Sequence, residues 1–126
     1  MREILFRGKR TDNGEWVEGF YSAEEYNLNI RKIEYIPRIQ IIGKCVSLGV
    51  LPETVGQFIG EVDKNGRKVF EGDIVKFKNE LFEVKFIEKY SRFSGVKPGV
   101  VFSVFLFSKS EVVGNVHDHP ELIKDG

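Results

Sequence analysis

Three potential metal ligands lie side by side near the end of the sequence, at His117, Asp118 and His119. Residues i and i+2 of an extended segment point to the same side, so both imidazoles can reach one ion. A catalytic metal site would need a third protein ligand, for which Glu121 is the nearest candidate. The alternative is a polar turn before a short helix that begins at Pro120, with Asp118 or His119 at its N-cap. We favour the turn, and we expect no bound metal and no cofactor.

The acidic residues Asp63, Glu71 and Asp73 are a second set with catalytic potential, because paired carboxylates can perform acid–base chemistry. Their neighbours favour a structural role. Asp63–Gly66 (Asp-Lys-Asn-Gly) is typical of a hairpin turn, since Asp and Asn bond their own backbone and Gly adopts positive φ. Glu71–Asp73 is typical of a turn that leads into the next strand. We therefore predict that these residues make turns, that no residue is catalytic, and that the protein is not an enzyme.

Six basic residues form a candidate nucleic-acid surface: Lys76, Lys78, Lys85, Lys89, Arg92 and Lys97. Tyr90 and Phe93 are interleaved with them, as on small barrels where bases stack on aromatic rings. Glu80, Glu83 and Glu88 lie in the same stretch, which favours a solvated strand face of mixed charge. The charge of the whole chain also favours the solvated face, because 19 Lys and Arg balance 19 Asp and Glu and the basic excess of most nucleic-acid binders is missing. A local nucleic-acid surface stays open as an alternative.

The elements that would position these residues belong to one compact domain, residues 1–126, because this length is close to that of a single domain. The composition, 41% apolar with 11 Phe, predicts a folded core. Cys45 is the lone cysteine and lies in an apolar context, which predicts a small buried side chain and a reducing, cytoplasmic location. No apolar stretch approaches the length of a membrane span.

Alternation and turn residues predict mostly β-structure. Met1–Phe6 and Trp16–Tyr21 form a hairpin through Asn13-Gly14. Ser22–Glu25 resembles a capping box and predicts one or two helical turns. Ile30–Val46 contains two strands, or one edge strand bent at Pro37.

The second half contains the clearest alternation, in the strand predicted at Leu81–Ile87. Ser91–Gly99 is rich in Gly and Pro and predicts a mobile loop. Val100–Phe107 is nearly all apolar, which predicts a strand covered on both faces or part of an interface. The remaining predicted elements are strands at Thr54–Ile59 and Glu111–Val116 and a short helix at Pro120–Ile123. The predicted fold class is mainly β: a small partly open β-barrel, SH3-like in part, or two packed antiparallel sheets, with short helical segments.

Three segments together resemble the YopX-like family of phage and prophage proteins. The first is Arg2–Gly8 with Trp16–Gly19, the second runs from Thr54 to Val75 and includes Glu71-Gly72-Asp73-Ile74-Val75, and the third is Val113–Leu122. Their order and spacing cover most of the chain, although the family usually has other residues at the positions of His117 and His119. The resemblance implies a phage-encoded cytoplasmic protein of unknown function with no established active site. It also implies a homo-oligomer, such as a trimer.

Three functions follow as hypotheses. The leading one is a non-enzymatic phage accessory protein that self-associates and acts through protein contacts. The observation that supports it is the apolar Val100–Phe107 segment. The second is a small-barrel nucleic-acid-binding protein that uses the six basic residues. The third is a metal-dependent enzyme built on His117 and His119. We expect no membrane association in any of them.

Overall fold

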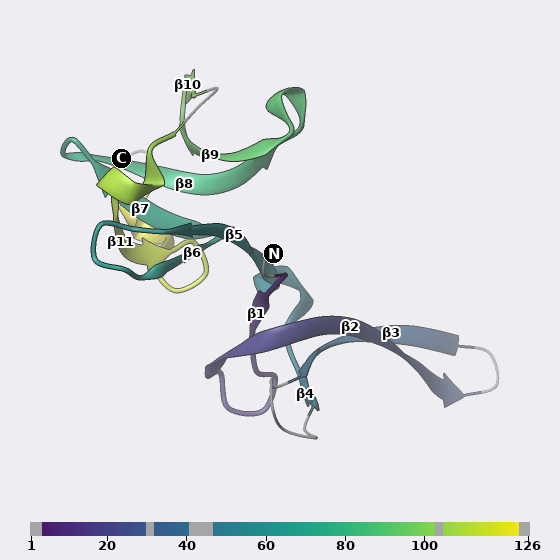
Figure 1. The fold of residues 1–126 in the computed structure, drawn as a ribbon. Helices are drawn as coiled ribbons and strands as arrows, with labels where there is room; N and C mark the ends of the chain where they lie inside the picture. The colour runs from purple at the N-terminus through teal and green to yellow at the C-terminus, as the bar shows by residue number, and fades with distance from the viewer. Residues whose placement is uncertain (1–3, 30–31, 41–46, 103–104, 124–126) are drawn as a thin grey trace. The chain divides into compact units, whose positions relative to one another are not determined.

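The computed structural model describes residues 4–29, 32–40, 47–102 and 105–123, and for residues 22–29, 32–37 and 47 it describes the backbone alone. Most of these residues lie in β-strands, which form two antiparallel sheets, with four short 3-10 turns (Figure 1). The predicted mainly β class is confirmed, in its two-sheet form. The chain divides into two compact units, residues 1–57 and 58–126, and we describe each by itself.

The first unit is a meander of antiparallel strands. Its elements are β1 (Phe6–Lys9), β2 (Trp16–Asn29), β3 (Lys32–Gln40), β4 (Ser47–Gly49), the 3-10 turn η1 (Pro52–Thr54) and the beginning of β5 (Gly56–Val62). The strand order is β4-β3-β2-β1-β5. Leu5, Ile39 and Val50 are at most 1% exposed and form the apolar interior of this unit. A hairpin of the predicted kind is present, but the predicted first strand, Met1–Phe6, is misplaced: β1 is Phe6–Lys9, and residues 1–3 lie outside the described residues. The turn extends from Arg10 to Glu15.

The predicted helical turn after Ser22 is wrong, because this segment is part of β2. Strands β2 and β3 pair from Phe20↔Gln40 to Asn27↔Ile33, well past the ends of β1 and β4 (Figure 1). Hydrogen bonds between paired strands override a weak local capping signal. Pro37 lies one residue beyond Arg38, where the pairing of β3 with β4 ends, and a missing N–H is tolerated at such an edge.

The second unit contains a five-stranded sheet with the order β10-β9-β8-β7-β11 and a hairpin of β5 with β6. Its further elements are β6 (Lys68–Phe70), β7 (Asp73–Phe77), β8 (Glu80–Ile87), η2 (Glu88–Tyr90), β9 (Arg92–Lys97), β10 (Val100–Val101), η3 (Phe107–Lys109), β11 (Glu111–Asn115) and η4 (Pro120–Leu122). The core residues are Ile59, Val69, Val75, Phe82, Val84, Phe105, Phe107 and Val112. Strands β8 and β11 and the turn η4 confirm the predictions for those segments within a residue or two.

The predicted mobile loop at Ser91–Gly99 is wrong, because Arg92–Lys97 is strand β9. The loop was predicted because a glycine such as Gly95 commonly interrupts a strand. A Cβ atom at Gly95 would lie 2.5 Å from the Phe105 ring, so the glycine admits a core aromatic side chain and does not break the strand.

The predicted long strand at Val100–Phe107 is also wrong. Of the described residues in this segment, only Val100 and Val101 pair with β9, and Phe107 begins η3. Phe105 packs against Phe82 at 5.2 Å and against Phe107 at 4.8 Å between ring centroids, and Phe105 and Phe107 are both buried. Phe105 and Phe107 fill the core of the second unit, whereas Val101, Phe102 and Leu106 of the same segment are 50%, 37% and 54% exposed. The apolar character of the segment therefore does not reflect a continuous strand with two covered faces.

Two predictions concern features outside these elements. Cys45, predicted to be buried, lies outside the described residues. Within the described ranges, no helix has the length and apolar character needed to cross a membrane.

Candidate functional site

The carboxylate of Asp63 is buried, 4% exposed, and its oxygens accept three backbone hydrogen bonds. Oδ1 accepts from the N–H groups of Asn65 and Arg67, both at 2.9 Å, which closes the turn between β5 and β6. Oδ2 accepts from the N–H of Val112 in β11 at 2.9 Å. The predicted hairpin turn is confirmed, with Gly66 at φ +80°. The carboxylate also fastens the turn to the edge of the five-stranded sheet.

These contacts set the charge state of Asp63. Burial alone would raise the pKa of the carboxyl group, but the N–H groups of Val112, Arg67 and Asn65 together lower the pKa below its ordinary value. The carboxylate is therefore charged at neutral pH and its hydrogen-bonding capacity is used by backbone donors. Such a group holds structure, whereas a general acid or base must be able to reach a substrate.

Glu71-Gly72-Asp73 forms the predicted turn between β6 and β7. Asp73 is 1% exposed, and its Oδ2 accepts a 2.8 Å hydrogen bond from the N–H of Phe70. Gly72 has φ +92°, donates its N–H to the carbonyl of Val84 and accepts from the N–H of Val116 through its own carbonyl. The turn thus joins three parts of the second unit. Asp73 and Gly72 therefore stabilise the conformation of the backbone in this turn.

His117, Asp118 and His119 lie in a turn after β11, as the structural interpretation predicts. Asn115 organises this turn, because its Oδ1 accepts from the N–H groups of His117 and Asp118 at 3.0 and 2.9 Å. His119 occupies the N-cap position of η4, and its Nδ1 accepts from the N–H of Asn115 at 3.3 Å. Among the residues that the structure describes, no group of three or more His, Cys, Asp or Glu side chains is placed to hold a metal ion.

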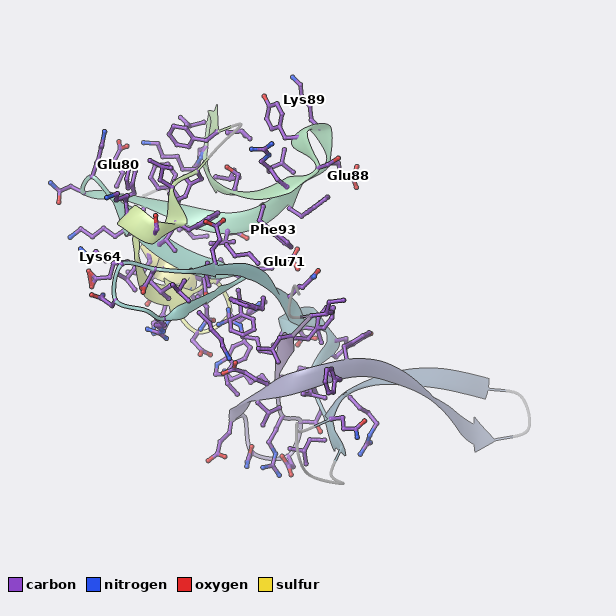
Figure 2. All side chains as sticks on the ribbon, viewed as in Figure 1. Lys64, Glu71, Glu80, Glu88, Lys89 and Phe93 are labelled. Carbon is purple, nitrogen blue, oxygen red and sulfur yellow. The ribbon has the colours of Figure 1, made fainter. Side chains whose placement is uncertain are left out.

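The six candidate basic residues are distributed over the second unit. Figure 2 shows Lys89 beside Glu88 at the turn that joins β8 to β9, whereas Glu80 lies at the turn that joins β7 to β8, at the other end of β8. Lys97 Nζ lies 2.7 Å from an oxygen of Glu80, so it belongs to that second end. Lys85 Nζ lies 3.8 Å from an oxygen of Glu83 in the middle of β8.

The remaining three basic residues follow the same pattern. Lys78 is at the β7–β8 turn, Arg92 begins β9 near Lys89, and Lys76 lies in β7 opposite Glu111. The six cations are therefore spread over two ends and the middle of the sheet, among acidic side chains. The nucleic-acid surface stays a prediction.

A pocket of about 560 Å³ lies on the second unit and was missed by sequence reasoning. Its lining residues are Leu81, Glu83, Lys85, Val96, Lys97, Pro98, Gly99, Val101, Leu122 and Ile123. Leu81, Glu83 and Lys85 alternate along β8 and share the face opposite to Phe82 and Val84, which point into the core. The one available signal was Leu81, an apolar residue on the polar side of the alternating strand.

These features define a class: a mainly β protein of antiparallel hairpins in which the conspicuous acids and glycines form turns. The comparisons with known proteins then give the family. The model of the YopX protein family matches residues 5–124, and the chain therefore belongs to this family.

One solved structure is similar over nearly the whole chain. It is described as the crystal structure of protein EF1440 from Enterococcus faecalis, with 23% sequence identity and a TM-score of 0.54. The match covers 98% of this chain and 100% of that chain. At this identity the likeness concerns the fold. A comparison with curated proteins found no match.

Proposed function

We propose that this protein is a phage-encoded accessory protein of the host cytoplasm that acts without catalysis, by self-association and contacts with other proteins. The observation that supports self-association is the pairing of β2 with β3. Residues 21–29 of β2 and 32–37 of β3, here called the β2–β3 ribbon, pair with each other beyond the ends of β1 and β4. No other strand among the described residues pairs with this part of the ribbon.

A two-stranded ribbon is marginally stable in water on its own, so a third strand or a covering surface would stabilise it. Among the described residues, neither edge of the ribbon has a strand partner, and such an edge favours addition of a strand from another chain. A second copy of the chain carries the same strands, and it is the occupant that we propose.

Exposed aromatic side chains at the base of the ribbon support the proposal that this part of the molecule is a contact surface. Phe20 is 53% exposed and Tyr21 is 43% exposed, and the Tyr21 ring lies 5.4 Å from that of Phe6. Large apolar side chains that adjoin an unpaired strand edge are typical of interaction surfaces. Contact with a second copy would cover them.

The absence of catalysis is supported by the positions of the acidic residues. The carboxylates of Asp63 and Asp73 accept backbone hydrogen bonds inside turns. The phage setting is supported by the family resemblance.

Sedimentation of the purified protein at micromolar concentration tests the proposal. We expect a discrete oligomer, and we expect Phe20→Glu to shift it toward monomer because a charge would have to be buried at the contact. Leu106→Glu is the matched control, since Leu106 is 54% exposed, as Phe20 is, but lies in the second unit. A stable monomer in the unmodified protein would overturn self-association. Equal effects of the two variants would overturn the role of the ribbon, and salt-dependent retention on DNA or RNA would support the nucleic-acid alternative instead.

A further inference from the structure

The pocket on the second unit has two walls on the face of the sheet opposite to the core. Val96 pairs with Glu83, and Val101 pairs with Val96, so both share the outer face with Leu81 and Glu83. The turn between β9 and β10, with Pro98 and Gly99, forms one wall.

The second wall is η4 together with Ile123. Gly114 of β11 lies opposite Ile74 of β7, and a Cβ atom at Gly114 would lie 3.2 Å from Leu122 Cδ1. The C-terminal turn therefore packs onto the outer face of the sheet through the glycine, and Ile74 on the same face is 0% exposed. The pocket is the hollow left between this turn and the β9–β10 turn.

The lining is mostly aliphatic. Leu81, Val96, Val101, Leu122 and Ile123 contribute apolar side chains, and of these Val101 is 50% and Leu122 is 36% exposed. A volume of about 560 Å³ falls within the range of small-molecule sites. A bound apolar chain would cover surface that now contacts water, which is favourable by the hydrophobic effect.

The charged lining residues indicate the head group of a ligand. Two cations, Lys85 and Lys97, and one anion, Glu83, contribute to the lining, which gives a net positive charge. Lys97 is held by Glu80 at 2.7 Å. The Lys85–Glu83 pair is longer, 3.8 Å, and the Lys85 side chain is 54% exposed. An exposed pair of this kind contributes little stability, so the ammonium of Lys85 can turn to another carboxylate at little cost.

We propose that this pocket binds a small amphipathic carboxylic acid, with the aliphatic chain among the five apolar side chains and the carboxylate on Lys85. Binding of this kind goes beyond the proposed self-association and does not depend on it. The contact is reversible and involves no covalent step.

Titration with decanoate, below its micelle concentration, tests the proposal through chemical shifts of the backbone amides of β8 and β9. We expect saturable binding that tightens roughly fourfold for each CH₂ from hexanoate to decanoate. Lys85→Met keeps an apolar side chain but removes the charge, and we expect it to weaken decanoate binding about tenfold while leaving decanol binding unchanged. Lys76→Met is the matched control, because Lys76 is exposed on β7 and does not line the pocket.

A second variant, Val101→Trp, fills the hollow from a half-exposed position, and we expect it to abolish binding with an unchanged thermal midpoint. No saturable shift with decanoate would overturn the site. Equal weakening by Lys85→Met and Lys76→Met, or equal affinity for decanoate and decanol, would overturn the assignment of the carboxylate to Lys85.

Discussion

The carboxylate of Asp63 shows how much structure one buried side chain can hold. Its two oxygens connect the β5–β6 turn with the N–H of Val112 in β11. Asp63→Asn keeps the shape but replaces one oxygen by an NH₂ group, which cannot accept a hydrogen bond. We expect a loss of about 1–3 kcal/mol in the free energy of unfolding, measured by urea denaturation at neutral pH.

The contribution of Asp63 also depends on pH. Its folded-state pKa is lower than the ordinary value of 3.8, so folding favours the charged form. The stabilisation is complete above the ordinary pKa and is lost as the pH falls through the lowered folded pKa. The difference in unfolding free energy between the unmodified protein and Asp63→Asn should therefore disappear at acidic pH.

Asp12 provides the control for this titration. The hydrogen bond from Arg10 lowers the pKa of Asp12 as well, but this pair is exposed to solvent. Asp12→Asn should leave the urea midpoint nearly unchanged at every pH. A constant effect of Asp63→Asn from neutral to acidic pH would contradict the role of its charge.

Gly72 has a backbone conformation that favours glycine. Its φ of +92° costs an L-residue about 1–2 kcal/mol, and a β-branched side chain there also approaches Val116 and His117. Gly72→Val should unfold the second unit, as followed by thermal denaturation. Gly66→Ala has a similar φ of +80° with no atom within 4 Å, so it should show the conformational cost alone. Normal thermal stability of Gly72→Val would rule out the turn assignment.

At the scale of elements, β9 depends on close contact between a strand and an aromatic ring. Gly95→Ala would place a Cβ atom 2.5 Å from the Phe105 ring, and we expect a destabilisation of about 1–3 kcal/mol. Phe105→Leu alone should also destabilise, because it leaves a void in the core. In the double variant the two losses should be less than additive, since the smaller side chain leaves room for the methyl group. Strict additivity in a urea-denaturation cycle would contradict direct contact.

The elements that could be predicted from sequence are those whose signals are local. Alternation in Leu81–Ile87 and the turn residues Asp63 and Gly66 depend on neighbours in the chain. Strand β9 and the close approach of Gly95 to the Phe105 ring could not be predicted, because a glycine looks like a chain breaker until the ring that packs on it is known. The capping pattern at Ser22 failed because pairing with β3 is a long-range interaction.

The candidate pocket was not predicted, for the same reason. Its lining residues range from Leu81 to Ile123 and meet only through strand register and through the contact of Leu122 with Gly114. The basic residues attracted notice in the sequence because they are numerous. Their separation becomes visible only when the ends of β8 are known, because residues close in the sequence lie at opposite ends of that strand.

At the scale of the whole molecule, charge balance should dominate solution behaviour. The sequence has 19 basic and 19 acidic residues and a pI of about 6.7. Solubility in low salt should therefore be lowest near this pH, because mutual repulsion between molecules is weakest there. Turbidity measured across a pH series checks this. Lys78→Glu with Lys89→Glu, both exposed, should move the minimum to lower pH, and an unmoved minimum would show that net charge does not control it.

The hydrogen bond from Val112 to Asp63 joins positions 49 residues apart in the chain. A ribosome completes the β5–β6 turn well before it adds the residue that satisfies the second oxygen of that carboxylate. During this interval the buried position of Asp63 has no complete set of donors, so the closing contact must come late in synthesis. A chain that ends before β11 would lack the N–H donor of Val112, so the Asp63 carboxylate would lose one of its three backbone hydrogen bonds. The β5–β6 turn of such a fragment should open more often and be cleaved faster by proteases.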